Sequence, residues 1–400
     1  MRLSSSLRVA LLALVGAACM ACASTPRPTA GVPIESIHPS RSTDSIQPSS
    51  PTESPDQASR GWHQVDRSIL GADRGVSLTR VAWSGEAAVI LGAVRERPSV
   101  WIEQPDGGWL QSLAPARQDP ARAVAAIAHD DWLLVSIRDE LTGTTTVWRL
   151  DQETWTPSGE GAFPPGSVVT DFASTGSLLV AVGAVTDGFA EDPEGSTAAV
   201  WTSLDGSDWE RSELFGDLRG ARLLDVAFGL DGLVAAGART RNGGADGVLL
   251  FSEDGLTWRR IETGGLAAAD DESVLAVAST DRAWLATGRV APARCLGTGC
   301  VDTLHRQWAS TDGTAWTFTD DGGMPPQLFG ANDESFFGIR FEGPSLEVAA
   351  SPDGQDWRAI TGVLRVADDV IVGGWSRSID GFVVAAVAPN DQTLLVWRSN

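Results

Sequence analysis

Short apolar runs separated by turns rich in Asp and Gly recur along residues 60–400. One copy reads as four strands, at residues 223–228, 233–237, 247–252 and 258–261. The runs are rich in Val, Ile, Leu and Trp, and Asp231-Gly232 marks the turn between the first two. No segment of helix length shows the 3.6-residue period of an amphipathic helix. The pattern therefore predicts an all-β chain of four-stranded units.

Four of these units contain the pattern Ser-x-Asp-Gly-x-x-Trp between their third and fourth strands. The copies occupy residues 203–209, 252–258, 310–316 and 351–357, with looser copies at 103–109 and 149–155. The closing Trp residues of successive copies are 41 to 58 residues apart. A period of this size is typical of a supersecondary unit repeated in a closed or stacked array, and four-stranded units fit propeller blades.

The two ends of the repeat region predict how the ring closes. Residues 395–400 match the third strand of a unit and stop where the turn to a fourth strand begins, whereas residues 60–65 match the start of a fourth strand. The N-terminal segment then supplies the last strand of the last blade, which removes exposed sheet edges. We predict a seven-bladed β-propeller over residues 60–400, with one closing Trp in each blade: Trp62, Trp109, Trp155, Trp209, Trp258, Trp316 and Trp357.

The repeated heptapeptide resembles the Asp-box, or BNR repeat, of sialidases and related propellers. The resemblance implies a structural role, in which the Asp carboxylate accepts backbone N–H groups of its own turn and the Trp packs between sheets. The Asp residues of the four full copies are Asp205, Asp254, Asp312 and Asp353. Sialidases use a Tyr nucleophile, and because this chain has no Tyr, we expect no sialidase activity.

The N-terminus is predicted to be a targeting segment. Residues 1–18 combine Arg2 and Arg8 with a short apolar run that is too short to span a bilayer, which is the layout of a signal peptide. Residues 15–19, Val-Gly-Ala-Ala-Cys, resemble a bacterial lipobox, which implies lipid attachment at Cys19 on the extracytoplasmic side of the cell membrane. Cys22 as the lipidated residue, and secretion without a lipid, are the alternatives.

Residues 19–59 are predicted to be a disordered tether between that anchor and the propeller. Nineteen of the 35 residues 24–58 are Ser, Thr or Pro, and none is aromatic. Such a segment cannot bury enough apolar surface to offset the entropy lost on ordering.

Charge and composition exclude several classes of function. The formal net charge is −22, so electrostatic binding to nucleic acid or to anionic lipid is disfavoured. The chain has no Lys, which excludes Schiff-base and Walker-type chemistry, and its four His residues are too few and too scattered to suggest a metal site. No nucleophile elbow, zinc-protease motif or phosphate loop is present. We expect no catalytic residues, no cofactor, no metal and a monomeric protein.

Cys295 and Cys300 enclose four residues in a long loop of the fifth blade. In an exported protein this spacing favours a local disulfide that orders the loop; free thiols and a metal site are the alternatives.

Arginines recur near the end of the second strand in five units, at Arg95, Arg138, Arg239, Arg289 and Arg340. Equivalent positions on separate blades are arranged around a ring, and a guanidinium suits a carboxylate or phosphate ligand. A ligand site at one central mouth is the functional interpretation, and local pairing with acids such as Asp139, Glu140 and Glu342 is the alternative.

The sequence thus favours a membrane-anchored, non-catalytic binding or scaffold propeller with a protein or glycan ligand on the face of the long loops. Two alternatives stay open. One is a carbohydrate-active hydrolase or lyase on the same fold, since 52 acidic residues could place two carboxylates in one pocket. The other is an assembly factor for a membrane complex, by resemblance to propellers with that role.

Overall fold

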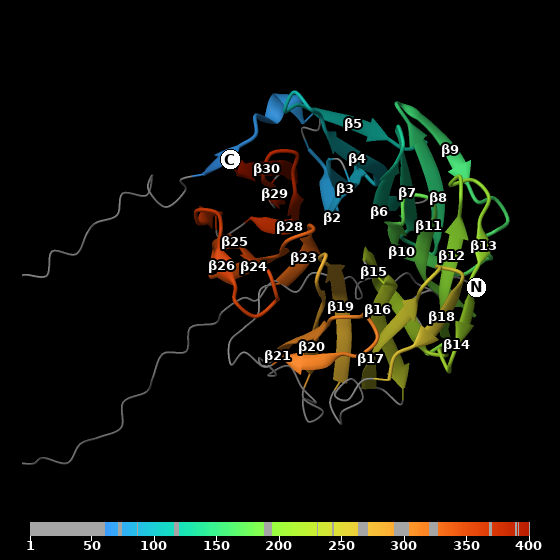
Figure 1. Ribbon diagram of the computed structural model, residues 1–400. Coiled ribbons are helices and arrows are strands. Elements are labelled where there is room, and N and C mark those ends of the chain that lie inside the picture. The colour runs from blue at the N-terminus through green and yellow to red at the C-terminus, as the bar shows by residue number, and fades with distance from the viewer. Residues whose placement is uncertain are drawn as a thin grey trace, which may run out of the picture. The chain divides into compact units, whose positions relative to one another are not determined.

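Seven antiparallel sheets surround one axis in the described part of the computed structural model (Figure 1). The described residues are 61–70, 74–85, 87–115, 120–187, 194–229, 231–241, 244–262, 271–291, 304–319, 327–367, 370–388, 390 and 392–399. The predicted signal peptide, the tether, Cys19, Cys22, Cys295 and Cys300 lie outside these residues. Residues 58–400 form one compact unit.

Each blade is a meander in which the first strand lies nearest the axis. Blade 1 consists of β2 (Val76–Trp83), β3 (Ala88–Val94), β4 (Arg97–Glu103) and β5 (Trp109–Leu113). Blade 2 consists of β6 (Ala121–His129), β7 (Trp132–Asp139), β8 (Thr145–Asp151) and β9 (Thr154–Ser158). Blade 3 consists of β10 (Ser167–Ser174), β11 (Leu179–Thr186), β12 (Ser196–Ser203) and β13 (Glu210–Arg211). Blade 4 consists of β15 (Ala221–Gly229), β16 (Gly232–Arg241), β17 (Gly244–Ser252) and β18 (Thr257–Arg260).

The last three blades repeat this order. Blade 5 consists of β19 (Asp271–Ser279), β20 (Trp284–Ala291), β21 (Leu304–Ser310) and β22 (Thr317–Thr319). Blade 6 consists of β23 (Gln327–Ala331), β24 (Phe336–Glu342), β25 (Ser345–Ser351) and β26 (Arg358–Ala359). Blade 7 is β28 (Ile371–Arg377), β29 (Phe382–Ala388), β30 (Thr393–Ser399) and β1 (Trp62–Gln64). Two short strands join the outer edges of blades 4 and 6, namely β14 (Glu213–Phe215) on β18 and β27 (Leu364–Arg365) on β25.

The predicted ring closure is confirmed. β1 pairs antiparallel with β30, with Trp62 opposite Ser399 and Gln64 opposite Trp397. The Trp62 indole N–H also donates to the Gly362 carbonyl at 2.7 Å. The N-terminal strand therefore completes the blade that contains the C-terminal strand, and β28 contacts β2 to close the ring (Figure 1).

A β-bulge interrupts the first strand of every described blade at the same place. In blade 3 it lies between Val169 and Asp171, and in blade 4 between Leu223 and Asp225. Gly183 and Gly237 stand opposite these bulges, and a Cβ on either would lie about 2 Å from a backbone oxygen of the first strand. A bulge re-aims the side chain that follows it, so it selects which residue faces the axis.

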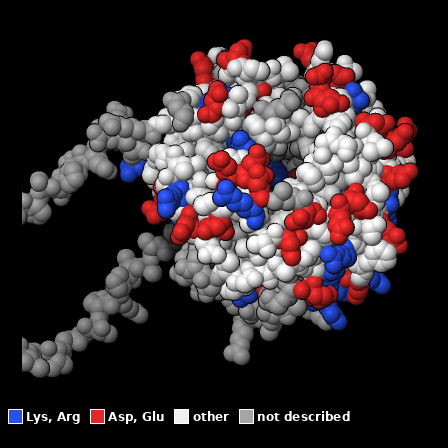
Figure 2. Space-filling view, viewed as in Figure 1, with Lys and Arg blue, Asp and Glu red and all other residues white. Residues whose placement is uncertain are grey.

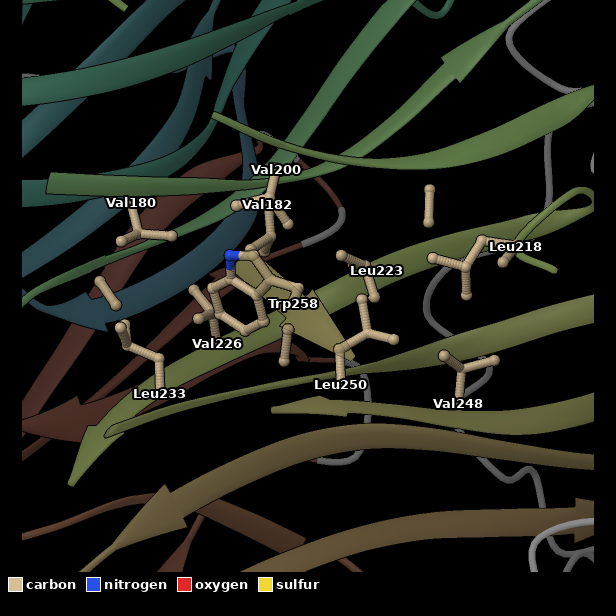
Figure 3. Packing of buried hydrophobic residues seen from close by; sticks show 14 residues of the cluster. Val180, Val182, Val200, Leu218, Leu223, Val226, Leu233, Val248, Leu250 and Trp258 are labelled. Carbon is tan, nitrogen blue, oxygen red and sulfur yellow. The ribbon is translucent and has the colours of Figure 1, made fainter. Parts of the chain in front are cut away.

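Apolar side chains fill the space between neighbouring sheets. In the cluster between blades 3 and 4, Val180 and Val200 meet Val226, Leu250 and the fully buried Trp258 (Figure 3). Strand residues alternate between the two faces of each sheet, so every blade packs against both of its neighbours. Burial of this size makes the ring a rigid support for the groups at its axis.

The described residues contain one helix, the three-residue 3-10 turn η1 (Arg67–Ile69), and no helix among them is long and apolar enough to cross a bilayer.

Candidate binding site at the axis of the ring

The meander places two sets of turns on one face of the ring, called here the turn face. The inner turns join the first and second strands at residues 84–87, 130–131, 175–178, 230–231, 280–283, 332–335 and 378–381. The outer turns join the third and fourth strands at residues 104–108, 152–153, 204–209, 253–256, 311–316 and 352–357. The opposite face carries the connections between second and third strands and is called the loop face.

The four full heptapeptides form one repeated turn. In blade 5, Oδ1 of Asp312 accepts the backbone N–H groups of Thr314 and Ala315, each at 2.8 Å. The closing indole of Trp316 donates to the Gly313 carbonyl at 2.8 Å. Asp205, Asp254 and Asp353 make the same pair of backbone contacts. These carboxylates thus bind their own turns.

Backbone donors explain the ionisation of these four Asp residues. Because hydrogen bonds from two N–H groups stabilise the charged form, they lower the pKa of Asp205, Asp254 and Asp353, and that of Asp312 to about 2. The carboxylates carry charge to low pH, and one oxygen of each is used within its turn.

The five arginines proposed from the sequence do not gather at one mouth. Four of them lie within their second strands, and Arg95 occupies the turn after β3 with φ of 50°. Arg239 is 9% exposed and binds Asp217 and the Arg219 carbonyl of its own blade. Arg340 donates to the Trp357 carbonyl at 3.3 Å, and Glu347 lies 3.5 Å away on the next strand.

The strand register places these arginines at different positions of their blades. Gly237 and Gly338 stand opposite the residues before their bulges, Leu223 and Leu328. In blade 2 the residue in that position is Ile137, so Arg138 is one residue out of step with Arg239 and Arg340. A shift of one residue turns a side chain to the opposite face of the sheet.

A different set of charged residues meets inside the ring. Arg80, Asp171 and Asp225 each follow the bulge in the first strand of blades 1, 3 and 4. The Arg80 guanidinium donates to Asp171 Oδ1 at 2.9 Å and to Asp225 Oδ1 at 3.2 Å. The equivalent positions of the other blades hold Ala125, Ala276, Gly330 and Gly374. Four small residues and one long side chain therefore allow Arg80 to reach blades 3 and 4.

Both carboxylates of this axial cluster are bound through both of their oxygens. Asp171 Oδ2 accepts the Val226 N–H of blade 4 at 3.2 Å, and Asp225 Oδ2 accepts the Val277 N–H of blade 5 at 2.8 Å. The two side chains are only 11% and 12% exposed, whereas Arg80 is 38% exposed. The cluster thus joins successive blades, and Arg80 is its solvent-facing member.

Burial dominates the electrostatics of the cluster. Removal of Asp171 from water raises its pKa, and the Arg80 charge and the Val226 N–H oppose that change. The adjacent Asp171 and Asp225 carboxylates raise the pKa of Arg80, which therefore stays protonated.

A cavity of about 600 Å³ opens at the axis on the turn face. It is lined by the ends of the first strands and the inner turns of blades 1 to 4, including Trp83, His129, Phe172, Val226 and Phe228. Phe228 is 48% exposed, so an aromatic ring is available to a ligand there. A second cavity of about 490 Å³ lies beside it and shares Phe228.

A buried carboxylate joins blades 1 and 7 on the same face. Glu103 is 1% exposed and accepts the N–H groups of Ala88 and Ile379, each at 3.1 Å, and the Ser378 hydroxyl at 3.0 Å. Its Oε1 also pairs with Arg398 of β30. This contact lies between the first blade and the blade that contains both chain ends.

Sequence reasoning missed the axial cluster and the cavity. The signal available was one repeat position at which Arg80, Asp171 and Asp225 replace small residues. The bulge re-aims the residue that follows it, so the two-residue alternation of a strand does not show that this position faces the axis. Within the described part of the chain, no group of three or more His, Cys, Asp or Glu residues is arranged to hold a metal ion.

No protein-family model and no curated protein matches this chain. Solved structures with a similar fold include YCF48 bound to a D1 peptide, at 11% identity and a TM-score of 0.51 over 85% of this chain and 97% of that one. Virginiamycin B lyase from Staphylococcus aureus is similar at 8% identity and a TM-score of 0.53, over 85% and 99%. The β-propeller domain of the Trilobed protease from Pyrococcus furiosus is similar at 11% identity and a TM-score of 0.50, over 81% and 96%. At these identities the likeness shows the propeller fold alone.

Proposed function

We propose that this protein is a non-catalytic binding module whose ligand site is the axial cavity of the turn face. The observation that carries the proposal is the cavity itself, which four consecutive blades line with aromatic and aliphatic side chains and with polar groups such as His129 and Asp130. Ligand sites in proteins are concave, largely apolar and of this volume. The site differs in place from the one suggested by the sequence, which lay on the loop face.

The state of the nearby carboxylates supports binding rather than catalysis. A general acid or base needs an oxygen within hydrogen-bond reach of the substrate. In Asp171 and Asp225 every carboxylate oxygen already accepts a hydrogen bond from Arg80 or from a backbone N–H. YCF48, which has been solved with a bound D1 peptide, shares the fold and supports a polypeptide as one kind of ligand. An assembly factor for a membrane complex would be a binder of this kind.

Ligand arrays of peptides and glycans, probed with the purified protein, test the proposal. Phe228→Ala removes the exposed ring of the cavity, and we expect it to weaken capture of any array ligand about tenfold. Phe318→Ala, at another exposed ring outside the cavity lining, is the matched control. Ligands whose affinity is unchanged by Phe228→Ala would place the binding site elsewhere.

A carbohydrate-active hydrolase or lyase is the second candidate, and one observation favours it. Asp171 and Asp225 lie against the same guanidinium, and the raised pKa of Asp171 suits a general acid. Turnover of any member of a glycan panel, lost in Asp171→Asn, would establish this activity and end the non-catalytic proposal.

We further propose that the protein is attached to the extracytoplasmic side of the membrane through a lipid on Cys19, with residues 19–59 as the tether. The expected result of Cys19→Ser is release into the medium or an unprocessed precursor. Membrane fractionation combined with mass measurement distinguishes the outcomes. A Cys19→Ser protein that stays in the membrane fraction at the lipidated mass would assign the anchor to Cys22.

A further inference from the structure

Two cavities of the turn face, one at the axis and one beside blades 4 and 5, have Phe228 in both of their linings, and together they are called here the groove. The second cavity is lined by Asp231, Phe251, Glu253, Arg259 and Asp312, and it shares Phe228 with the axial cavity. Phe228 belongs to β15, the first strand of blade 4, and Phe251 to β17, the third strand. The lining of the groove thus includes both the first and the third strand of blade 4.

Acidic side chains dominate the turns around this groove. The exposed acids of the inner turns are Asp130, Asp131, Asp231, Asp281, Asp333, Glu334 and Asp380. The outer turns add Asp106, Glu153, Asp205, Asp208, Glu253, Asp254, Asp312, Asp353 and Asp356. Among the described residues of both sets of turns, Arg282 is the one basic side chain. Figure 2 shows one face of the ring, on which acidic and basic side chains both lie around a central hollow.

The loop face has a different charge balance. It carries the arginines that lie near the ends of second strands, together with Arg122, Arg219 and Arg306, several of them paired with an acid. Among the described residues, the turns of the turn face are therefore mainly acidic, whereas the loop face carries charges of both signs.

Arginines of this protein already use the aromatic rings on and near the turn face. The guanidinium of Arg149 lies 4.3 Å from the ring centre of Trp132, that of Arg377 lies 5.0 Å from Trp83, and that of Arg259 lies 5.3 Å from Phe251. Trp83 and Phe251 line the groove. Cations are attracted to such ring faces, most strongly where acids lie nearby.

We propose that the groove binds a polypeptide segment rich in Lys or Arg, an inference that rests on the binding function proposed above. The acidic turns attract its charges, and the exposed ring of Phe228 contacts the stems of its long side chains. A partner of this composition complements the turn face in charge, whereas an acidic partner or a nucleic acid is repelled by it.

The test measures binding of two labelled peptides of equal length to the full chain, one of alternating Arg and Ser and one of alternating Glu and Ser. We expect only the Arg–Ser peptide to bind, and its affinity to fall as salt is raised because exposed charges are screened. Asp130→Asn combined with Asp231→Asn and Glu253→Gln should weaken binding about tenfold. These positions are exposed, so an unchanged melting temperature checks that the fold is kept.

A matched control removes the same charge from the loop face. Glu96→Gln, Asp187→Asn and Glu342→Gln are exposed in the described structure, and together they should leave the affinity for the Arg–Ser peptide within about twofold. Equal losses in the two triple variants would mean that total charge, rather than the groove, attracts the peptide, and would overturn the proposal.

Two further outcomes separate this inference from the binding function on which it rests. If neither peptide binds while array ligands still depend on Phe228, the cavity remains a binding site and the basic ligand class is wrong. If no ligand depends on Phe228, the binding function itself is wrong. If spermine binds as tightly as the Arg–Ser peptide, the groove is a site for small polyamines, and the proposal of a polypeptide ligand is overturned.

Discussion

The single residue that recurs most regularly in this molecule is the Asp of the outer turn, and its contacts are local. In Asp312, Oδ1 accepts two N–H groups from its own turn and the Ser310 hydroxyl at 3.1 Å. A carboxylate with these donors exchanges a few water contacts for fixed ones, so it stabilises the turn without help from another blade. The expected contribution is that of a small set of hydrogen bonds to an exposed group.

We expect Asp312→Ala to lower the free energy of unfolding by about 1 kcal/mol at neutral pH. Backbone N–H groups of the turn lower the pKa of Asp312 from its usual 3.8 to about 2, so the folded state favours the charged form. Its stabilisation is complete above pH ~4 and is lost as the pH falls through about 2. Chemical denaturation of both proteins across this window measures the effect. A difference between them that stays constant down to pH 2 would contradict the assignment.

Arg80 is a second single residue of importance, and the carboxylates that it binds are largely buried, whereas Asp312 is exposed. Arg80→Met removes the cation shared by two carboxylates that are nearly closed off from solvent. Leaving buried charges without a partner costs about 3–5 kcal/mol, so we expect a loss of that size in denaturation experiments.

A second variant separates the charge effect from lost packing. Arg80→Met combined with Asp171→Asn and Asp225→Asn removes all three charges, and each Asn keeps an oxygen for the Val226 or Val277 N–H. The triple variant should regain most of the lost stability. If it is as unstable as Arg80→Met alone, packing of the Arg80 stem, and not its charge, holds the cluster.

At the scale of single elements, β1 has an importance out of proportion to its three residues. It supplies the fourth strand of blade 7, and the Val65 N–H extends the pairing to the Val396 carbonyl at 2.8 Å. Trp62 is 8% exposed and packs with Ile339 and Val384, so β1 also covers the side of blade 6. An outer strand with a buried Trp both satisfies a sheet edge and closes the core.

Two truncated proteins test this role of β1. A chain that begins at Arg67 lacks β1, and we expect it to lose about 3–5 kcal/mol or more, because a buried indole alone contributes that much. A chain that begins at Ser59 keeps β1 and should melt close to the full chain. Thermal melts compare the two, and equal melting temperatures would show that β1 does not hold the ring closed.

For the whole molecule, the critical place is the contact between blade 1 and the strands β28, β29 and β30 of blade 7, because only β1 of blade 7 is followed in the chain by blade 1. Glu103 holds that contact through donors from Ala88, Ser378 and Ile379 and through its pair with Arg398. Four donors on one buried carboxylate link the two ends of the repeat array. Glu103 therefore joins blade 1 to the three strands of blade 7 that come from the C-terminal end of the repeat region.

Glu103→Gln replaces one acceptor oxygen by an NH₂ group that faces these donors. We expect a loss of about 3 kcal/mol in the free energy of unfolding, because buried donors are left unpaired. Glu347→Gln, on the 27% exposed partner of Arg340, is the matched control and should cost less than about 1 kcal/mol. Urea denaturation measures both. Similar small losses would mean that water or a neighbouring group replaces the Glu103 contacts.

Local information was enough to predict the architecture. The heptapeptide motif spans only seven residues, and the closing Trp residues predict the number of blades. The match of residues 60–65 to a fourth strand predicts closure by β1. Each of these features depends on turn chemistry and strand period, which act between residues close in sequence.

Only the tertiary structure decided which residues meet at the axis. Arg80 lies 91 residues from Asp171 and 145 from Asp225, and no local pattern relates them. The bulge re-aims the side chain that follows it, and the register places Arg138 one residue out of step with Arg239. Side-chain direction in a sheet reverses with every residue, so a site built from several strands depends on a register that is fixed by packing between blades.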